Sequence, residues 1–281
     1  MVDFAGQPAN YHIIRKICQK HNLHLVEDAA HTIGLQITQC PTKPYLPEVN
    51  QRYIGNIADL TIFSFHPVKN LTTGEGGMIM TNNEEYHINA DHYTDHGHDH
   101  IGQDRGAEAH PFLGYNFRIS ELHAAVGLGQ IRKLDMILST QRKNNAIIKN
   151  ALEKVEGVTF RRIPDPAGEN ASFLSFFLPS EDLARKAHQE LVANGLGGNF
   201  YWFDNNWHYI KKWDHLKNAT SLYPLNTKLK DAIAAMDFNA FKQSDQFMGR
   251  NISSLINLSW TEEQAHERAE KMAQTIQSVL S

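Results

Sequence analysis

The sequence predicts an α/β protein whose larger domain has a mostly parallel sheet and is followed by a smaller α+β domain. Helical and strand patterns alternate in the first third of the chain, which is typical of helices that cover a parallel sheet. A long helical region follows Ser120, and mixed β-like and helical segments return after Gly157. The chain of 281 residues is long enough for two moderate domains. We predict them over residues 1–145 and 146–281.

The first domain begins with a helix and three strands. Residues 11–21 have a helical pattern, and the short run at residues 24–27 predicts a strand that ends at Asp28. Residues 58–65 and 77–81 predict the next two strands because they are rich in Ile, Phe and Thr. Open α/β sheets bind their ligands at the carboxyl ends of strands, so we expect a ligand near Asp28.

Two polar stretches separate these elements from a long helical region. The proline-rich residues 40–56 predict a loop, and residues 87–111, rich in His, Asp and Gly, predict mostly surface loop. Ser120 is a suitable N-cap for a helical region that continues to about residue 154. We expect this region to bridge the two domains.

The second domain shows one clear strand and two clear helices. Residues 173–178 predict a strand, and a helix over residues 181–194 is expected to stop at Gly195. The last helix opens at Thr261 with the pattern of a capping box.

Composition limits the partners. The 27 basic and 31 acidic residues give a formal charge of −4, which does not favour nucleic acid or an anionic membrane. Cys18 and Cys40 lack a metal or redox spacing, so we interpret both as free thiols in a reducing compartment. No apolar stretch approaches the roughly 18 residues that a membrane span needs. We therefore predict a cytoplasmic protein with a small-molecule partner.

Two blocks, at residues 27–31 and 63–77, contain the groups that pyridoxal phosphate requires. That cofactor needs a lysine amine to hold its aldehyde as an imine, and a carboxylate against its pyridine nitrogen. Lys69 and Asp28 fit these roles. The hydroxyl of Ser64, five residues before Lys69, can reach the cofactor phosphate if the strand ends between them.

At these residues the chain resembles the sugar aminotransferases of the DegT/DnrJ/StrS type, which have the aspartate aminotransferase fold. The matching motifs occur in the family's order: Val2-Asp-Phe-Ala-Gly6, Glu27-Asp-Ala-Ala-His31, Ser64-Phe-His-Pro-Val-Lys69-Asn, Thr73-Gly-Glu-Gly-Gly77 and Gly114-Tyr-Asn-Phe-Arg118. The resemblance implies fold type I of the pyridoxal-phosphate-dependent transferases, and an aminotransferase that transfers the amino group of glutamate or another amino acid to a keto-sugar. Cell-surface polysaccharide or lipopolysaccharide biosynthesis is the expected setting.

The resemblance also implies roles for single residues. Lys69 would form the Schiff base, Asp28 would pair with the pyridinium, His31 would lie beside the ring and Ser64 would bind the phosphate. Asn116 would bind the phosphate of a neighbouring subunit's cofactor, which makes the enzyme a homodimer with shared active sites.

The sequence departs from the family in one respect. Its Val-Asp-Phe-Ala-Gly motif begins at residue 2, whereas in the family this motif lies well inside the chain. We therefore expect a fragment or shortened product that covers roughly the last two thirds of a family member. This keeps a truncated, non-catalytic homologue open as an alternative.

Other interpretations differ in weight. A pyridoxal-phosphate-dependent sugar dehydratase of the same fold has histidine in place of the lysine, so Lys69 argues against it. A nicotinamide-dependent dehydrogenase is excluded because the chain has no G-x-G-x-x-G motif after a predicted strand. The histidines and aspartates of residues 91–100 have no recognised metal spacing, so we assign no metal ligands. The stretch Asp95-His-Gly-His98, with Arg105-Gly106 and Gly114-Tyr-Asn-Phe-Arg118, resembles instead the family branch that aminates an eight-carbon, 8-oxo ulosonic acid for lipopolysaccharide. The aromatic residues 200–213 could be domain core or could contact a sugar.

Overall fold

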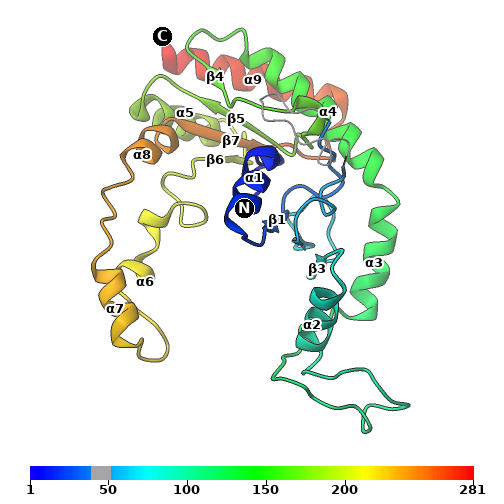
Figure 1. The fold of residues 1–281 in the computed structure, drawn as a ribbon. Helices are drawn as coiled ribbons and strands as arrows, with labels where there is room; N and C mark the ends of the chain where they lie inside the picture. Colours follow the sequence, from blue (N-terminus) through cyan, green and yellow to red (C-terminus); the bar gives the residue numbers. More distant parts are fainter. Residues whose placement is uncertain (39–51) are drawn as a thin grey trace. The chain divides into compact units, whose positions relative to one another are not determined.

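The computed structural model describes residues 1–38 and 52–281 and divides the chain into two compact units (Figure 1). Unit 1 comprises Met1–Arg142 and Ile163–Ser172, and unit 2 comprises Lys143–Arg162 and Phe173–Ser281. The first change of unit thus falls close to the expected boundary after residue 145. Most of the loop expected over residues 40–56, and Cys40 with it, lies outside the described residues.

Unit 1 contains a three-stranded sheet in the order β1 (Val26–Asp28), β2 (Leu60–Ser64) and β3 (Gly77–Met80). The strands expected near these positions are therefore confirmed. β1 pairs with β2 in parallel, and β3 joins β2 antiparallel. Alternate side chains point to opposite faces of a strand, so Glu27 and Thr61 are buried on one face while Asp28 projects from the other.

Four helices accompany this sheet: α1 (Tyr11–His21), α2 (Glu84–Thr94), α3 (Glu121–Ile131) and the first part of α4 (Leu134–Leu152). The helix predicted over residues 11–21 is confirmed, and its N-cap Asn10 accepts from the amide of Ile13. The apolar core of the unit includes Tyr11, Leu35 and Leu71, each at most 2% exposed.

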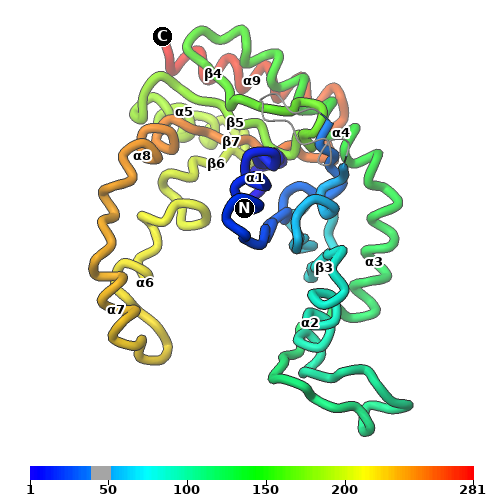
Figure 2. Tube along the Cα trace, in the orientation of Figure 1, coloured from blue at the N-terminus to red at the C-terminus, as the bar shows by residue number. Residues whose placement is uncertain are grey.

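Helix α2 corrects the expectation of a loop over residues 87–111. Asn83 caps the helix by accepting from the amide of Tyr86, and two glutamates occupy its first turn. Tyr86, Ala90 and Tyr93 follow at spacings of four and three, and they line an apolar groove with Ile62. The many polar residues between them obscured this short apolar face. The loop resumes at Asp95 and returns to α3 (Figure 2).

The long helical region expected after Ser120 is interrupted. Ser120 does cap α3, but that helix ends at Ile131 and α4 begins at Leu134. Gly127 and Gly129 lie in the last turns of α3, where glycine has a low helix propensity, and this weakens continuation of the helix.

Unit 2 is built on an antiparallel sheet in the order β4 (Thr159–Phe160), β5 (Phe173–Phe177), β7 (Asn251–Leu255) and β6 (Asn199–Phe200). Helices α5 (Glu181–Ala193) and α9 (Glu262–Leu280) pack into its core. The shorter helices are α6 (Asp214–Lys217), α7 (Thr227–Ala234) and α8 (Lys242–Met248). Among the described residues, 3-10 turns occur at Ile210–Lys212 here and at Pro166–Gly168 in unit 1. The expected strand, α5 and the capping box of α9 are confirmed. Among the described residues, no helix is both long and apolar enough to cross a membrane.

Candidate functional site

The candidate site begins at the carboxyl end of β1, where Asp28 leaves the sheet. The Asp28 amide donates to the carbonyl of Met1, and the Asp28 carbonyl accepts from the amide of Asp3, both at 2.9 Å. On the other side, the Ala29 amide donates to the carbonyl of Ile62 at 2.9 Å. Asp28 is thus fixed between two neighbouring segments, while its side chain is exposed on the open face of the sheet.

The adjacent strand β2 ends at Ser64 on the same face. Asp28 is in register with Ile62, and Ser64 lies two residues further along β2, so their side chains project to one side. A turn follows in which the Lys69 amide donates to the carbonyl of His66 at 2.9 Å. The structure therefore brings the three residues to one edge, as expected from the parallel pairing of the two strands.

The amine of Lys69 is electrostatically coupled to Asp28. Burial lowers the pKa of the half-buried Lys69 amine from its usual value, and the negative charge of Asp28 acts in the opposite direction. A lysine with a lowered pKa is a better nucleophile toward an aldehyde, because more of it is unprotonated near neutral pH.

His31 lies three residues beyond Asp28 and is held on two sides. Its Nδ1 accepts from the Ala5 amide at 3.3 Å, and its carbonyl accepts from Nδ2 of Asn170 at 2.6 Å. Gly6 makes this arrangement possible, since a Cβ there would lie 2.1 Å from Oδ1 of Asn170. Asn170 comes from the segment that returns to unit 1, and nothing in the local sequence indicated this contact.

A second contact outside the sequence prediction fixes the residue after Lys69. Asn70 and Gln141 exchange two amide hydrogen bonds, at 3.0 and 3.1 Å, and Gln141 is 3% exposed. These two hydrogen bonds attach the turn that contains Lys69 to α4. Gln141 lies in a polar helical stretch of the sequence, so its burial could not be inferred from the pattern.

The glycine-rich segment after the lysine turn folds back onto β2. The Thr73 amide donates to the carbonyl of Phe65 at 3.0 Å, and the Phe65 amide donates to the carbonyl of Gly76 at 2.8 Å. Gly74 and Gly76 have φ of +88° and +150°, which residues with a side chain rarely adopt. These two glycines allow the close return.

Asn116 lies on a different segment, in the loop between α2 and α3, where it forms an isolated bridge with Asp95. Asp95 is almost fully buried and accepts two hydrogen bonds of 2.9 Å from Arg105, and it also pairs with Arg118. Two partly exposed arginines thus pair with one buried carboxylate, and further acids, Asp91 and Glu108, lie in the same region.

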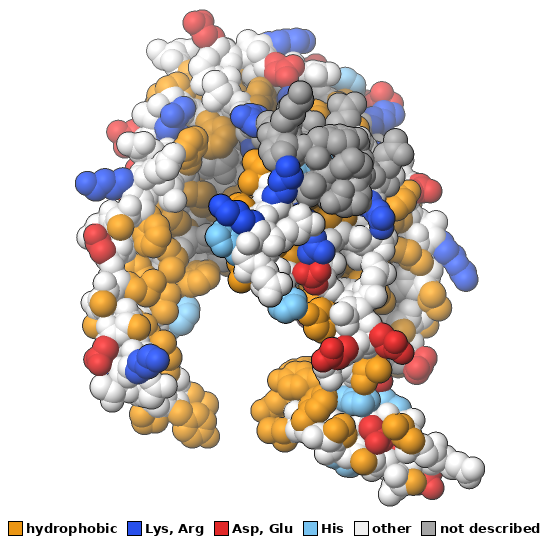
Figure 3. Space-filling view, in the orientation of Figure 1, with side chains coloured by type: hydrophobic (Ala, Val, Ile, Leu, Met, Phe, Trp, Pro, Cys, Tyr) orange, Lys and Arg blue, Asp and Glu red, His pale blue; other side chains and the backbone are white. Residues whose placement is uncertain are grey.

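The histidines of this region contact one another and also pair with acids. His98 Nδ1 lies 2.8 Å from Glu108 Oε2, and His100 Nε2 lies 3.3 Å from Asp91 Oδ2. Figure 3 shows histidine and acidic side chains together over the end of α2 and this loop. Within residues 1–38 and 52–281, no three His, Cys, Asp or Glu side chains form a group that could hold a metal ion.

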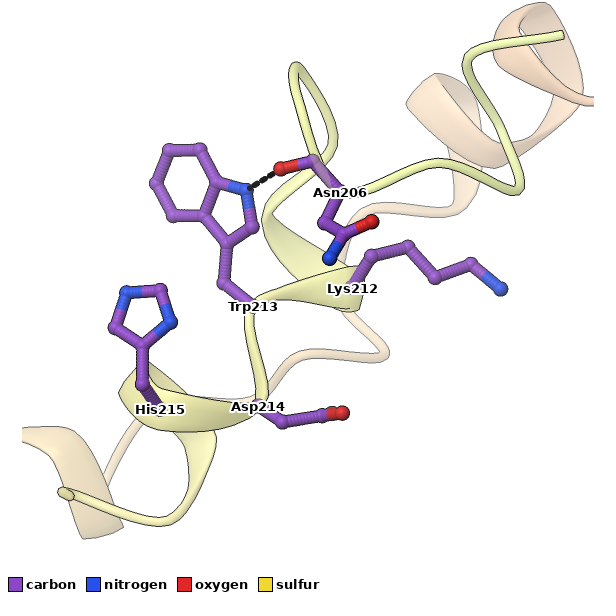
Figure 4. Close-up of a pocket in the computed structure, with 5 residues that line it drawn as sticks. All are labelled: Asn206, Lys212, Trp213, Asp214 and His215. Atoms are coloured by element: carbon purple, nitrogen blue, oxygen red, sulfur yellow. Dashed lines mark hydrogen bonds between the residues drawn. The ribbon is translucent and has the colours of Figure 1, made fainter.

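The aromatic segment of unit 2 is partly buried and partly exposed. Tyr201, Trp202 and Tyr209 are at most 5% exposed and belong to the interior, whereas Trp207 is 61% exposed. Nearby, a surface pocket of about 430 Å³ is lined by Asn206, Lys212, Trp213, Asp214 and His215 (Figure 4). The Trp213 indole donates to the Asn206 carbonyl at 2.7 Å, which leaves its ring face as the apolar wall.

Comparison of the sequence with known proteins shows which family it matches. The DegT/DnrJ/EryC1/StrS aminotransferase family matches residues 1–238. The UDP-4-amino-4,6-dideoxy-N-acetyl-beta-L-altrosamine transaminase of Campylobacter jejuni serotype O:2 is 36% identical over 200 residues, which are 70% of this chain and 49% of that protein. The spore coat polysaccharide biosynthesis protein SpsC of Bacillus subtilis is 29% identical over 198 residues, 68% of this chain and 48% of that protein.

Solved structures share the fold. Helicobacter pylori PseC, an aminotransferase involved in the biosynthesis of pseudoaminic acid, has a TM-score of 0.76 at 20% identity, over 99% of this chain and 66% of that chain. Spr1654 of Streptococcus pneumoniae, in its PLP form, has a TM-score of 0.75 at 19% identity, over 100% of this chain and 68% of that chain. The expected fold type I is confirmed. The chain spans about half the length of the curated relatives that it matches.

The coupling of Lys69 to Asp28 predicts a measurable change in amine reactivity. With a limiting amine-reactive label across a pH series, we expect Asp28→Asn to shift the half-labelling pH of Lys69 downward, because the carboxylate that stabilises its charged form is gone. Peptide mass spectrometry measures the labelled fraction, and the exposed Lys186 is the internal reference. An unchanged or raised half-labelling pH would show that Asp28 does not act on this amine.

Proposed function

Because the chain belongs to the DegT/DnrJ/EryC1/StrS aminotransferase family, we propose that it transfers an amino group from an amino acid, most simply glutamate, to a keto-sugar through pyridoxal phosphate. The product would be an amino sugar for cell-surface polysaccharide or lipopolysaccharide. The observation that carries the proposal is the parallel register of β1 with β2, which places Asp28 and Ser64 on one face at the edge from which the turn of Lys69 starts.

The side chains at this edge suit pyridoxal phosphate. Lys69 supplies an amine with a lowered pKa, Asp28 supplies an exposed carboxylate, and Ser64 supplies a hydroxyl on the same face. When bound, the cofactor provides an electron sink that stabilises the carbanion left after proton removal from the amino-bearing carbon. Asp28 would keep the pyridine nitrogen protonated, Ser64 would bind the phosphate and His31 would lie beside the ring.

The chemistry assigned to the chain is proton transfer and orientation. Lys69, once free of the cofactor, would act as the base and acid that moves a proton between the substrate carbon and the cofactor. The hydrogen bonds of Asn70 to Gln141 hold the turn that presents this amine. The bonds of His31 to Ala5 and Asn170 fix its ring and backbone in place.

We further propose a cytoplasmic homodimer in which Asn116 binds the cofactor phosphate of the neighbouring subunit. The exposed position of Asn116, on a loop between two helices, supports this role. Its backbone bridge to Asp95, itself held by Arg105 and Arg118, would keep the loop in shape for a contact outside its own chain.

For the substrate we propose a keto-sugar acid, an 8-oxo ulosonic acid, over a neutral keto-sugar. The partly exposed guanidinium groups of Arg105 and Arg118 support a substrate with a carboxylate, since arginine recognises this group through paired hydrogen bonds.

The first half-reaction, in which glutamate gives its amino group to the cofactor, tests the role of Lys69. With pyridoxal phosphate and glutamate, we expect the visible absorbance of the loaded protein to fall while 2-oxoglutarate forms. Lys69→Ala should reduce this rate at least about a hundredfold, because it removes the proton carrier. Lys186→Ala, an exposed lysine elsewhere, is the control and should keep the wild-type rate. A wild-type chain that never binds the cofactor would favour the non-catalytic homologue.

Subunit mixing tests Asn116. Lys69→Ala and Asn116→Ala variants should each be inactive, but their mixture should regain part of the activity. The reason is that a heterodimer carries one site with Lys69 from one chain and Asn116 from the other. Mass-tagged subunits report whether exchange takes place. If exchanged mixtures stay as inactive as the parents, Asn116 does not serve a neighbouring site.

A further inference from the structure

A buried polar ladder runs behind Asp28, across three neighbouring backbone segments. Residues 1–3 lie parallel to β1, and β1 lies parallel to β2, which aligns the side chains of Asp3, Glu27 and Thr61 on the buried face. Glu27 and Thr61 are both 0% exposed, and Asp3 is 1% exposed. The proposed mechanism assigns no role to these three residues.

Asp3 is surrounded by donors. Its Oδ1 accepts from the Ala9 amide at 2.8 Å, and its Oδ2 accepts from the Tyr11 hydroxyl at 2.8 Å and the Thr32 hydroxyl at 3.0 Å. Three donors directed at one buried carboxyl group match its ionised form, which can only accept.

Glu27 is in the opposite situation. Its Oε2 accepts from the Thr61 hydroxyl at 2.7 Å, but its buried Oε1 meets no donor among the described residues. The carboxyl groups of Glu27 and Asp3 are also close enough to interact by a hydrogen bond and by charge. Two ionised carboxylates in contact inside a protein repel one another without solvent to screen them. A proton on Glu27 removes the repulsion and gives Asp3 a further donor.

We propose that Glu27 keeps a proton at neutral pH, donates a hydrogen bond through it to Asp3, and thereby serves as a positioning residue for Asp28, its neighbour in β1. The shared proton ties residues 1–3 to β1 from the buried face. Asp28 projects from the other face of the same strand, so the pair holds the backbone from which that carboxylate emerges. Only the role toward Asp28 rests on the proposed function.

The electrostatics agree with the geometry. Burial raises the pKa of Glu27 to about 8, repulsion from Asp3 adds to this, and the bond from Thr61 opposes it. Burial raises the pKa of Asp3 as well, but the hydrogen bonds that Asp3 accepts from Ala9, Glu27 and Thr32 oppose this rise. We assign the proton to Glu27 because Asp3 already accepts three hydrogen bonds.

Carbon-13 resonances of labelled glutamate carboxyl groups test the proton directly. Glu27, assigned by its loss in Glu27→Gln, should titrate near pH 8, and Thr61→Val should move its midpoint upward by removing the bond that lowers its pKa. If Glu27 instead titrates with the exposed glutamates, near the usual pKa of about 4.5, the proposal of a shared proton would be overturned.

Stability gives a second readout with a matched control. A pKa raised in the folded state means that folding retains a proton, so stability should fall as pH rises from about 4.5 through about 8. Glu27→Gln, which keeps a neutral donor, should reduce this fall, and Glu263→Gln, an exposed control, should leave it unchanged. A fall that persists unchanged in Glu27→Gln would contradict the assignment.

Cofactor affinity tests the positioning role separately. Glu27→Ala should weaken pyridoxal phosphate binding about tenfold, the effect of one lost buried hydrogen bond, while Glu27→Gln should stay near wild type. Equal affinity in Glu27→Ala and wild type would overturn the positioning role. A wild-type chain that binds no cofactor would overturn the proposed function and the positioning role with it, and the carbon-13 titration would still decide the shared proton.

Discussion

The parallel pairing of β1 with β2 is the constraint on which the candidate site depends. Because Asp28 is in register with Ile62, the two strands end at one edge, and the turn after Ser64 presents Lys69 beside Asp28. The same pairing sets what lies behind the site, since alternation in a strand sends Glu27 inward wherever Asp28 points outward. A slip of one residue would exchange these two carboxyl groups.

The parts of the fold that are encoded locally could be predicted from the sequence. Asn10, Ser120 and Thr261 begin helices through their own side chains, and the strands near Asp28 and Ser64 carry their own β-rich patterns. Helix α2 was missed for a local reason as well. Its apolar face consists of only three residues, Tyr86, Ala90 and Tyr93. The His and Asp side chains between them give the segment the polarity of a loop.

The support of the site could not be predicted, because it comes from residues far apart in the chain. Asn170 reaches the His31 carbonyl across 139 positions, and Gln141 reaches Asn70 across 71. The roles of Lys69, Asp28, His31, Ser64 and Asn116 came from motifs whose order matches the family, and the contacts that hold these residues came only from the structure. Local patterns predict the reacting groups, whereas burial and long-range hydrogen bonds determine how rigidly each one is held.

The central claim is that Lys69 is the lysine that carries pyridoxal phosphate beside Asp28. Borohydride reduction of the loaded protein makes the link between the cofactor and its lysine permanent, and peptide mass spectrometry then locates the added mass. We predict that the pyridoxyl group is found on the peptide that contains Lys69, at a stoichiometry near one per chain. Modification spread over exposed lysines such as Lys186, with Lys69 unmodified, would contradict the account.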